Sequence, residues 1–266
     1  MLFFSLSTWV LALMLFAITL LASGIGLFAG RKVRHRSEEL REPFGVMQAT
    51  LLGFMGLILA FGLSLAVERY EDRRAAVVVE SNAIGTTYLR AQTLAEPVRS
   101  QSLTLLKDFT DTSIRLTHTV PTSPEANQVL ADSSQIETQL WGLAGQALEA
   151  APVDTAPRLY VDSLNETFDA QSSRTYGLGN RVPDEVLLLE VAGAALALGL
   201  LALHLATIGQ GVFTVVLAAV LVALILVVTF DLDRPTRGFI QVPADPLIAV
   251  RIAMNAPPAA SGPTAR

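Results

Sequence analysis

Four long apolar runs most constrain what this chain of 266 residues can fold into. They cover residues 9–29, 46–67, 186–205 and 212–230. The ionisable residues within these runs are Glu190 and His204, both in the third run. About 20 apolar residues suffice to cross the hydrocarbon core of a bilayer as a helix. Only 16% of all residues are charged, well below the usual share of a soluble domain. We therefore expect a membrane protein with four transmembrane helices.

The first run is expected to stay in the mature protein. A cluster of basic residues follows it directly: Arg31, Lys32, Arg34, His35 and Arg36. A secretory signal peptide has its basic residues before a shorter apolar core. The order and the length therefore favour a retained first span.

The runs pair into two hairpins on either side of a polar segment. Residues 1–67 form the first transmembrane hairpin, and residues 183–230 form the second, with a short glycine-containing link. Residues 68–182 are expected to be a soluble helical segment continuous with span 2, because their apolar residues recur at helical spacing. Residues 231–266 form a tail that we expect to be disordered from about residue 256. The fold class is all-α.

Prolines mark helix starts within the soluble segment. Pro97 suits the first turn of a helix, because its missing N–H group would have no partner there. Ser123 and Pro124 form an N-cap followed by a proline at the first helical position. The segment is therefore expected to be a bundle of several helices.

Charge in the first loop suggests an orientation. Residues 30–45 carry five Lys or Arg against three acids, which places this loop in the cytoplasm by the positive-inside rule. Residues 68–182 and the C-terminus would then lie outside. Arg69, Arg73 and Arg74 beside span 2 oppose this orientation.

The sequence contains no motif that indicates catalysis. It has no cysteine, and its histidines (His35, His118 and His204) are far apart and not at metal-ligand spacing. Neither a phosphate-binding loop nor a nucleophile elbow is present. With a net charge of -5 and no basic face, nucleic acid is not an expected partner. We expect no enzyme activity, no cofactor and no metal; the lipid bilayer is the expected partner.

Span 2 has one face of small residues. The candidate residues on and beside this face are Gly53, Gly56, Ala60, Phe61 and Ser64. Small residues let another helix approach closely, so packing is one interpretation. The other is that span 2 lines a pore in an oligomer, with bulky apolar side chains such as Phe61 forming a constriction.

Charged residues follow span 2 at once. Glu68, Arg69 and Arg73 could form the solvated exit of a helix from the membrane, with i,i+3 ion pairs along it. They could also form rings of charge at a pore mouth in an oligomer. The sequence leaves both interpretations open.

Glu190 and His204 lie near the two ends of span 3. Ionisable groups at membrane depth are costly and often functional. Each of the two is close enough to an end to reach the membrane interface instead, and we expect that placement.

Acidic residues end span 4. Asp231 and Asp233 lie at a helix C-terminus, where the helix dipole disfavours negative charge. We therefore expect them to pair with Arg234, Arg237 or a more distant partner. A structural clasp is the preferred interpretation, and a ligand site is the alternative.

Two stretches resemble the signatures of a known family. One runs from Leu51 through Arg90 and includes Ser64-Leu65-Ala66-Val67-Glu68-Arg69-Tyr70; the other is Asp231-Leu232-Asp233-Arg234-Pro235 with Gly238. They resemble the bestrophin-like family of bacterial integral membrane proteins of unknown function. The resemblance covers nearly the whole chain and implies a multi-pass protein of the bacterial inner membrane.

The resemblance also implies a function. Bestrophins proper are pentameric anion channels whose second span lines the pore and whose large segment is cytosolic, opposite to the charge count here. By analogy we expect a homo-oligomeric ion channel, with anions as the candidate ions and with span 2 lining the pore. The alternative is a non-conducting membrane scaffold or sensor whose helical segment binds a partner.

Overall fold

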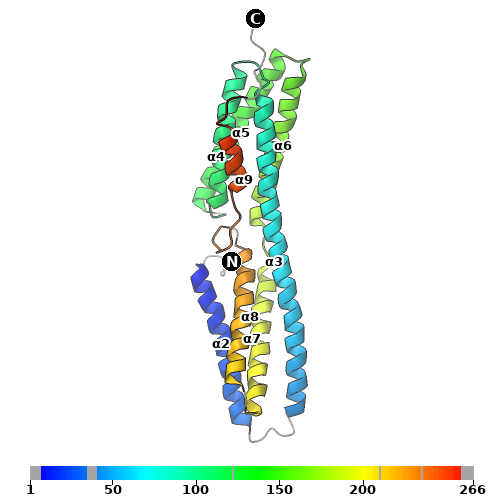
Figure 1. The fold of residues 1–266 in the computed structure, drawn as a ribbon, viewed down its shortest axis with the longest axis vertical. Helices are drawn as coiled ribbons and strands as arrows, with labels where there is room; N and C mark the ends of the chain where they lie inside the picture. The colour runs from blue at the N-terminus through cyan, green and yellow to red at the C-terminus, as the bar shows by residue number, and fades with distance from the viewer. Residues whose placement is uncertain (1–6, 35–40, 122, 210, 235, 259–266) are drawn as a thin grey trace. The chain divides into compact units, whose positions relative to one another are not determined.

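The computed structural model describes residues 7–34, 41–121, 123–209, 211–234 and 236–258. These ranges are helical for most of their length and contain no strand (Figure 1). They form two compact units. Residues 1–70 and 181–241 make up the membrane unit, and residues 71–180 and 242–266 make up the bundle unit. Residues 35–40, with His35 and Arg36 of the basic cluster, lie outside the described ranges, as do residues 259–266 of the tail expected to be disordered.

Four helices contain stretches long and apolar enough to cross a membrane. They are α2 (Thr8–Val33), α3 (Arg41–Ala91), α7 (Asp184–Thr207) and α8 (Val212–Leu232). Each includes one of the four expected runs, so the expected all-α class with four spans is confirmed. α3 is a single helix that leaves the membrane unit at Tyr70 and continues into the bundle unit.

Close backbone contact joins α2 to α7. A Cβ atom at Gly26 would lie 2.9 Å from the Ala202 Cβ and would overlap the Gly199 carbonyl oxygen. A Cβ at Gly30 would lie 2.7 Å from the Ala206 Cβ. In lipid, apolar surface gains little from burial against another helix, so packing contacts of this kind hold helices together. Only glycine permits this approach at either position.

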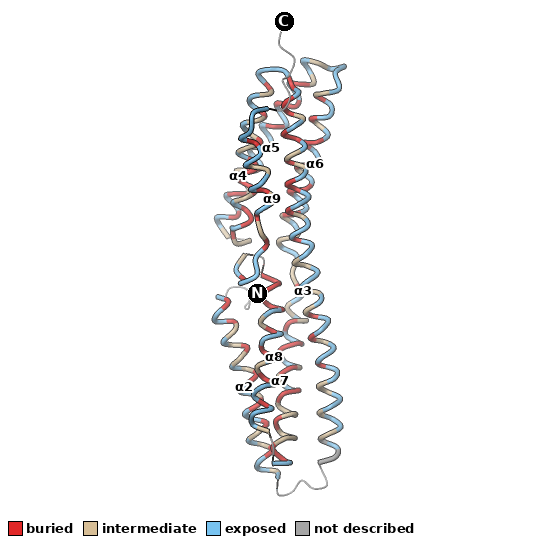
Figure 2. The backbone as a smooth tube through the Cα atoms, viewed as in Figure 1, coloured by how far each residue is buried: buried red, intermediate tan, exposed pale blue. Residues whose placement is uncertain are grey.

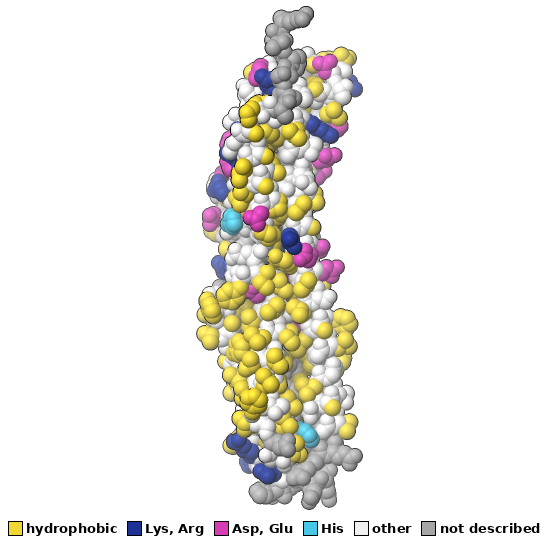
Figure 3. Space-filling model, in the orientation of Figure 1, with side chains coloured by type: hydrophobic (Ala, Val, Ile, Leu, Met, Phe, Trp, Pro, Cys, Tyr) yellow, Lys and Arg dark blue, Asp and Glu magenta, His cyan; other side chains and the backbone are white. Residues whose placement is uncertain are grey.

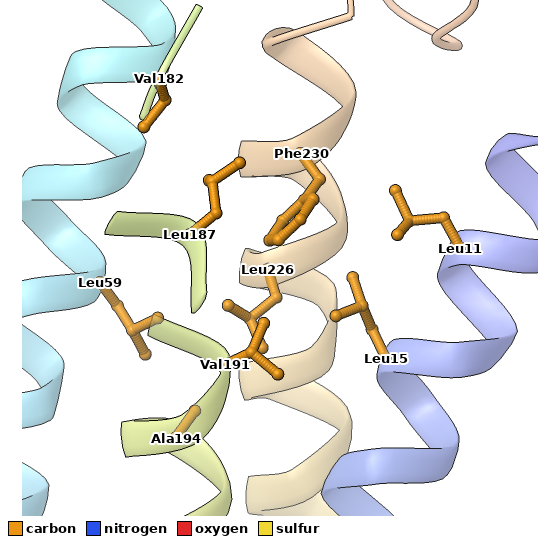
Figure 4. Close-up of a cluster of buried hydrophobic side chains, with 9 residues drawn as sticks. All are labelled: Leu11, Leu15, Leu59, Val182, Leu187, Val191, Ala194, Leu226 and Phe230. Atoms are coloured by element: carbon orange, nitrogen blue, oxygen red, sulfur yellow. The ribbon is translucent and has the colours of Figure 1, made fainter. Parts of the chain in front are cut away.

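A core of apolar side chains fills the membrane unit beside these contacts. Figure 4 shows Leu187 and Val191 of α7 facing Leu226 and Phe230 of α8. Leu11 and Leu15 of α2 and Leu59 of α3 complete the cluster, together with Val182 and Ala194. Each buried side chain of this size makes many weak dispersion contacts, which add up to a specific fit.

Two glycines close the link between α7 and α8. Gly209 has φ 79° and Gly211 has φ 102°, in the left-handed region that other residues rarely adopt. The short link expected from the sequence therefore has positive φ angles at both glycines, a backbone conformation that favours glycine at these two positions.

The bundle unit consists of helices with short connections. The remainder of α3 is followed by α4 (Val98–His118), α5 (Pro124–Ala150) and α6 (Thr155–Gly179). Ser123 caps α5 by accepting a hydrogen bond from the Ala126 N–H, with Pro124 at the start of the helix, which confirms the predicted cap. Pro97 directly precedes the first residue of α4.

A buried polar network ties the four bundle helices together. Glu80 of α3 is fully buried and forms an ion pair of 2.8 Å with Arg174 of α6. Glu80 also accepts a hydrogen bond of 2.7 Å from the Ser113 hydroxyl on α4. Gln171 of α6 donates to Ser113 and, at 2.7 Å, to Ser133 of α5. Burial raises the pKa of Glu80, an effect that Arg174 and Ser113 offset only in part.

The last helix, α9 (Asp245–Ala253), returns to the bundle unit and packs there on α4. Tyr88 of α3 donates a hydrogen bond of 2.9 Å to the Met254 carbonyl, and Arg251 pairs with Asp111 of α4 at 2.8 Å. Leu247 is completely buried. The tail from residue 242 through α9 therefore belongs to the bundle unit.

We expect Gly26→Ala to destabilise the membrane unit, because the new methyl group would overlap the Gly199 carbonyl and force α2 away from α7. Overpacking of this kind costs about 1–3 kcal/mol. The matched control is Gly24→Ala on the same helix, where no atom lies within 4 Å of the added Cβ. Thermal unfolding of the purified protein in detergent should show a lower midpoint for the first variant alone. Equal midpoints would mean that the close approach is not required.

We expect Glu80→Ala to lower the stability of the bundle strongly, because it leaves the buried Arg174 guanidinium without its carboxylate. Removing one partner of a buried ion pair costs about 3–5 kcal/mol. Glu71→Ala is the control: its pair with Arg74, 3.6 Å apart, is more than half exposed and contributes less than about 1 kcal/mol. Urea unfolding followed by circular dichroism measures both. A small effect of Glu80→Ala would show that water reaches Arg174.

Candidate functional site

The candidate pore or packing face of α3 is exposed, although Gly56 and Ala60 at its edge also border a groove toward α7. Gly53, Gly56, Ala60, Phe61 and Ser64 are all exposed, and an added Cβ at Gly53 or at Gly56 would meet nothing within 4 Å. Figure 2 shows this part of α3 as largely exposed, in contrast to α7. Phe61 has 66% of its surface exposed. The face is therefore available to lipid, to another copy or to a pore.

The opposite face of α3 is turned toward α7. Met55 and Leu59 are buried, and Met55 covers Gly193 of α7 so closely that a Cβ at Gly193 would overlap the Met55 sulfur. Gly62 and Ala66 continue the same face one and two turns further on. The small residues of span 2 thus lie on two faces of α3, whereas the sequence predicted a single face.

An apolar groove of about 290 Å³ lies between the two helices. It is lined by Leu52, Met55, Gly56, Leu59, Ala60 and Leu63 of α3, by Ala194, Ala197 and Leu198 of α7, and by Val222 and Ile225 of α8. α3 therefore meets α7 through a few side chains and leaves space beside them, whereas α2 meets α7 backbone to backbone. This difference makes α3 the span with the least packing inside its own chain.

The charges after span 2 have different surroundings. Glu68 is exposed and Arg69 is half-buried, both in the membrane unit. Arg73 is buried in the bundle unit and donates a hydrogen bond of 2.8 Å to the Asn180 carbonyl. Among the three candidates for a ring of charge, Glu68 is the side chain most open to solvent.

Glu190 and His204 both lie against glycines of α3. Glu190 is completely buried, and a Cβ at Gly62 would overlap its Oε1 atom. His204 is partly exposed, and its Cε1 would be 3.2 Å from a Cβ at Gly45. The sequence did not point to Gly62 as a neighbour of Glu190. A glycine opposite an intramembrane acid would indicate such a contact, but the two can be matched only when the register between α3 and α7 is known.

Asp231 caps a turn after α8. Its carboxylate accepts hydrogen bonds of 2.8 Å from the backbone N–H groups of both Phe239 and Ile240. Gly238 lies in this turn, where a Cβ would be 2.8 Å from the Asp231 carbonyl oxygen. The Phe239 ring in turn packs edge-on against Trp9 of α2, with centroids 5.1 Å apart. The contacts are those of a clasp within the protein.

Asp233 and Arg234 are buried beside this turn. Asp233 accepts a hydrogen bond of 3.0 Å from the Val182 N–H, just before α7. Burial lowers the pKa of Arg234, and Arg237 and Arg181 lower it further, while Asp231 acts in the opposite direction. Backbone N–H groups of distant residues thus bind both carboxylates.

No group of three or more His, Asp or Glu side chains lies close enough together to hold a metal ion within the described parts of the chain. A groove of about 690 Å³ opens between α4 and α5 in the bundle unit, lined by Gln101, Gln139, Gln146, Ser100, Thr104 and neighbouring residues. It contains no titratable side chain, so its lining suits hydrogen bonding better than acid–base chemistry.

Hydrophobic side chains cover the visible surface of the spanning helices in the membrane unit, as Figure 3 shows. The exposed hydrophobic residues of the spans include Trp9, Phe28, Phe213 and Leu217. A surface of this kind suits a lipid environment and would be a large apolar patch in water.

Comparison with solved structures finds the same fold in bacterial bestrophin homologues from Klebsiella pneumoniae. One point variant has a TM-score of 0.70 at 15% identity, over 94% of this chain and 97% of that chain. A second variant gives 0.66 at 17%, over 91% and 96%, and the structure phased with zinc gives 0.66 at 17%, over 89% and 96%. No curated protein sequence matches.

The family model for the bestrophin-like domain matches residues 13–247, which include most of α2, the other three spans, α4 to α6 and the Asp231 turn. The match covers most of the chain and agrees with the fold found by structural comparison. The chain belongs to the bestrophin-like family.

Proposed function

We propose that the protein is a homo-oligomeric ion channel in which α3 of each copy lines the pore. The observation that carries this proposal is the exposed face of α3. The fold that the chain shares with bacterial bestrophin homologues supports it, because bestrophins are known as ion channels. The cell membrane, in bacteria the inner membrane, is the proposed location.

The composition of this face suits a pore between copies. Gly53, Gly56 and Ala60 leave space at the helix surface, so that neighbouring copies could approach closely. Phe61 projects from the same region and is large enough to narrow an axial channel. Apolar constrictions of this kind close a pore by excluding water.

The weak packing of α3 within its chain also supports a role in gating. α3 rests on α7 through side chains such as Met55 and leaves an apolar groove beside them. A helix held in this way can tilt without breaking the contact between α2 and α7. A change in the tilt of α3 in each copy would widen or narrow the pore.

Phe61→Ala should raise the conductance of the purified protein in planar bilayers, because the smaller side chain widens the apolar constriction. Phe28→Ala on α2 is the matched control: Phe28 is also an exposed aromatic residue on a span, at 72% exposure, and should not affect current. Absence of current at any voltage, together with a monomer or dimer in native mass spectrometry, would contradict the channel. It would favour the scaffold or sensor instead.

Glu68→Gln should shift the reversal potential of that current toward anions, because a ring of carboxylates at a pore mouth favours cations. Glu185→Gln, at the start of α7, removes an equally exposed carboxylate from another span and is the control. Recordings in asymmetric salt give the two reversal potentials. Equal values for both variants and the unmodified protein would place Glu68 away from the ion path.

A further inference from the structure

Glu190 is an acid inside the membrane unit with no partner. Its side chain is completely buried, and both carboxyl oxygens lack a hydrogen-bond partner among the residues that the structure describes. Buried polar groups in proteins are nearly always hydrogen-bonded. An orphaned carboxyl group buried in the membrane unit therefore calls for an explanation in terms of what it binds.

No opposite charge faces Glu190 from the helices around it. α2 carries no charged residue from Thr8 to Gly30, α3 none from Gly45 to Val67, and α8 none from Val212 to Phe230. The nearest charged residues along these helices lie at the span ends: Glu68 and Arg69 on α3, Asp231 on α8, and Asp184 and Glu185 on α7 itself. An ionised carboxylate at Glu190 would thus have no cationic side chain beside it within the described spans.

α3 supplies a glycine where the carboxyl group lies. Any side chain at Gly62 would overlap Glu190 Oε1, so the acid occupies the space that a methyl group would take on α3. The residues near this contact along both helices are apolar: Leu59 and Leu63 lie within one turn of Gly62, and Ala194, one turn beyond Glu190 on α7, lines the apolar groove. The surroundings fit a neutral group.

We propose that Glu190 is an intramembrane proton-binding site, which holds its proton while Gly62 of α3 is packed against it. A charge at this depth is costly unless it is paired or hydrated. The carboxylic acid avoids that cost, whereas the carboxylate does not. Loss of the proton would therefore require α3 to move away from α7 so that water or a counter-ion can enter.

Proton binding would in this way be coupled to the position of α3. The acid favours the packed arrangement, and the carboxylate favours an arrangement in which Gly62 has withdrawn. By linkage, a movement of α3 that admits water would also release the proton. The proton site does not require that the protein conduct ions. Absence of current in bilayer recordings would contradict the channel alone, whereas an ionised Glu190 would contradict the proton site alone.

Labelling with dicyclohexylcarbodiimide tests the proposal on the unmodified full-length protein in lipid vesicles. The reagent is apolar and reacts with protonated carboxyl groups: the acid proton passes to a carbodiimide nitrogen, the carboxyl oxygen bonds to the central carbon, and rearrangement leaves a stable acylurea. We expect peptide mass spectrometry to place the adduct on Glu190 at neutral pH. The infrared carbonyl band of a protonated acid should be present at the same pH and absent from Glu190→Gln.

Two glycine variants provide the matched comparison. Gly62→Ala displaces α3 from the acid and should reduce labelling at neutral pH, whereas Gly24→Ala on α2, where no atom lies within 4 Å of the added Cβ, should leave it unchanged. Absence of both the adduct and the infrared band in the unmodified protein would overturn the proposal. Suppression of labelling by sodium or potassium at constant pH would identify a metal-cation site and would overturn the assignment to a proton.

Discussion

Close packing of α2 against α7 at Gly26 and Gly30 is the contact on which the membrane unit depends. In lipid, where burying apolar surface brings little gain, two backbones that touch along several turns fix the position of α7. α7 in turn carries the core residues Leu187 and Val191 and presents Glu190 to α3. The precise placement of one helix pair is what allows the third, α3, to be held loosely without loss of the fold.

The bundle unit is held by a different kind of interaction. Beside its buried apolar side chains it contains Glu80, Arg174 and Gln171, which hydrogen-bond to hydroxyl groups on neighbouring helices. Such a network adds little net stability compared with apolar packing, but it penalises every register in which a partner is missing. Large buried side chains such as Phe109, Tyr160 and Leu140 pack beside this network and add the apolar contribution to stability.

The sequence predicted what periodicity and composition determine: four spans, two hairpins, an all-α class and the cap at Ser123. It did not predict features that depend on register between helices. Gly26 and Gly53 have similar neighbours along the chain, yet one touches a backbone and the other touches nothing. Likewise the partners of Asp231 are backbone N–H groups eight and nine residues later, which no charge pattern could indicate. The burial of Glu190 also follows only from the position of Gly62.

The hydrogen bond from the Val182 N–H to Asp233 has a consequence for synthesis. It joins the residues just outside the two ends of the α7–α8 hairpin, at the side opposite the glycine link. When α7 leaves the ribosome, Asp233 has not yet been made, so the hairpin cannot be closed until α8 is complete. The two helices are therefore expected to enter the bilayer as a pair, and the closed pair then offers α2, already in the membrane, a finished surface on which to dock.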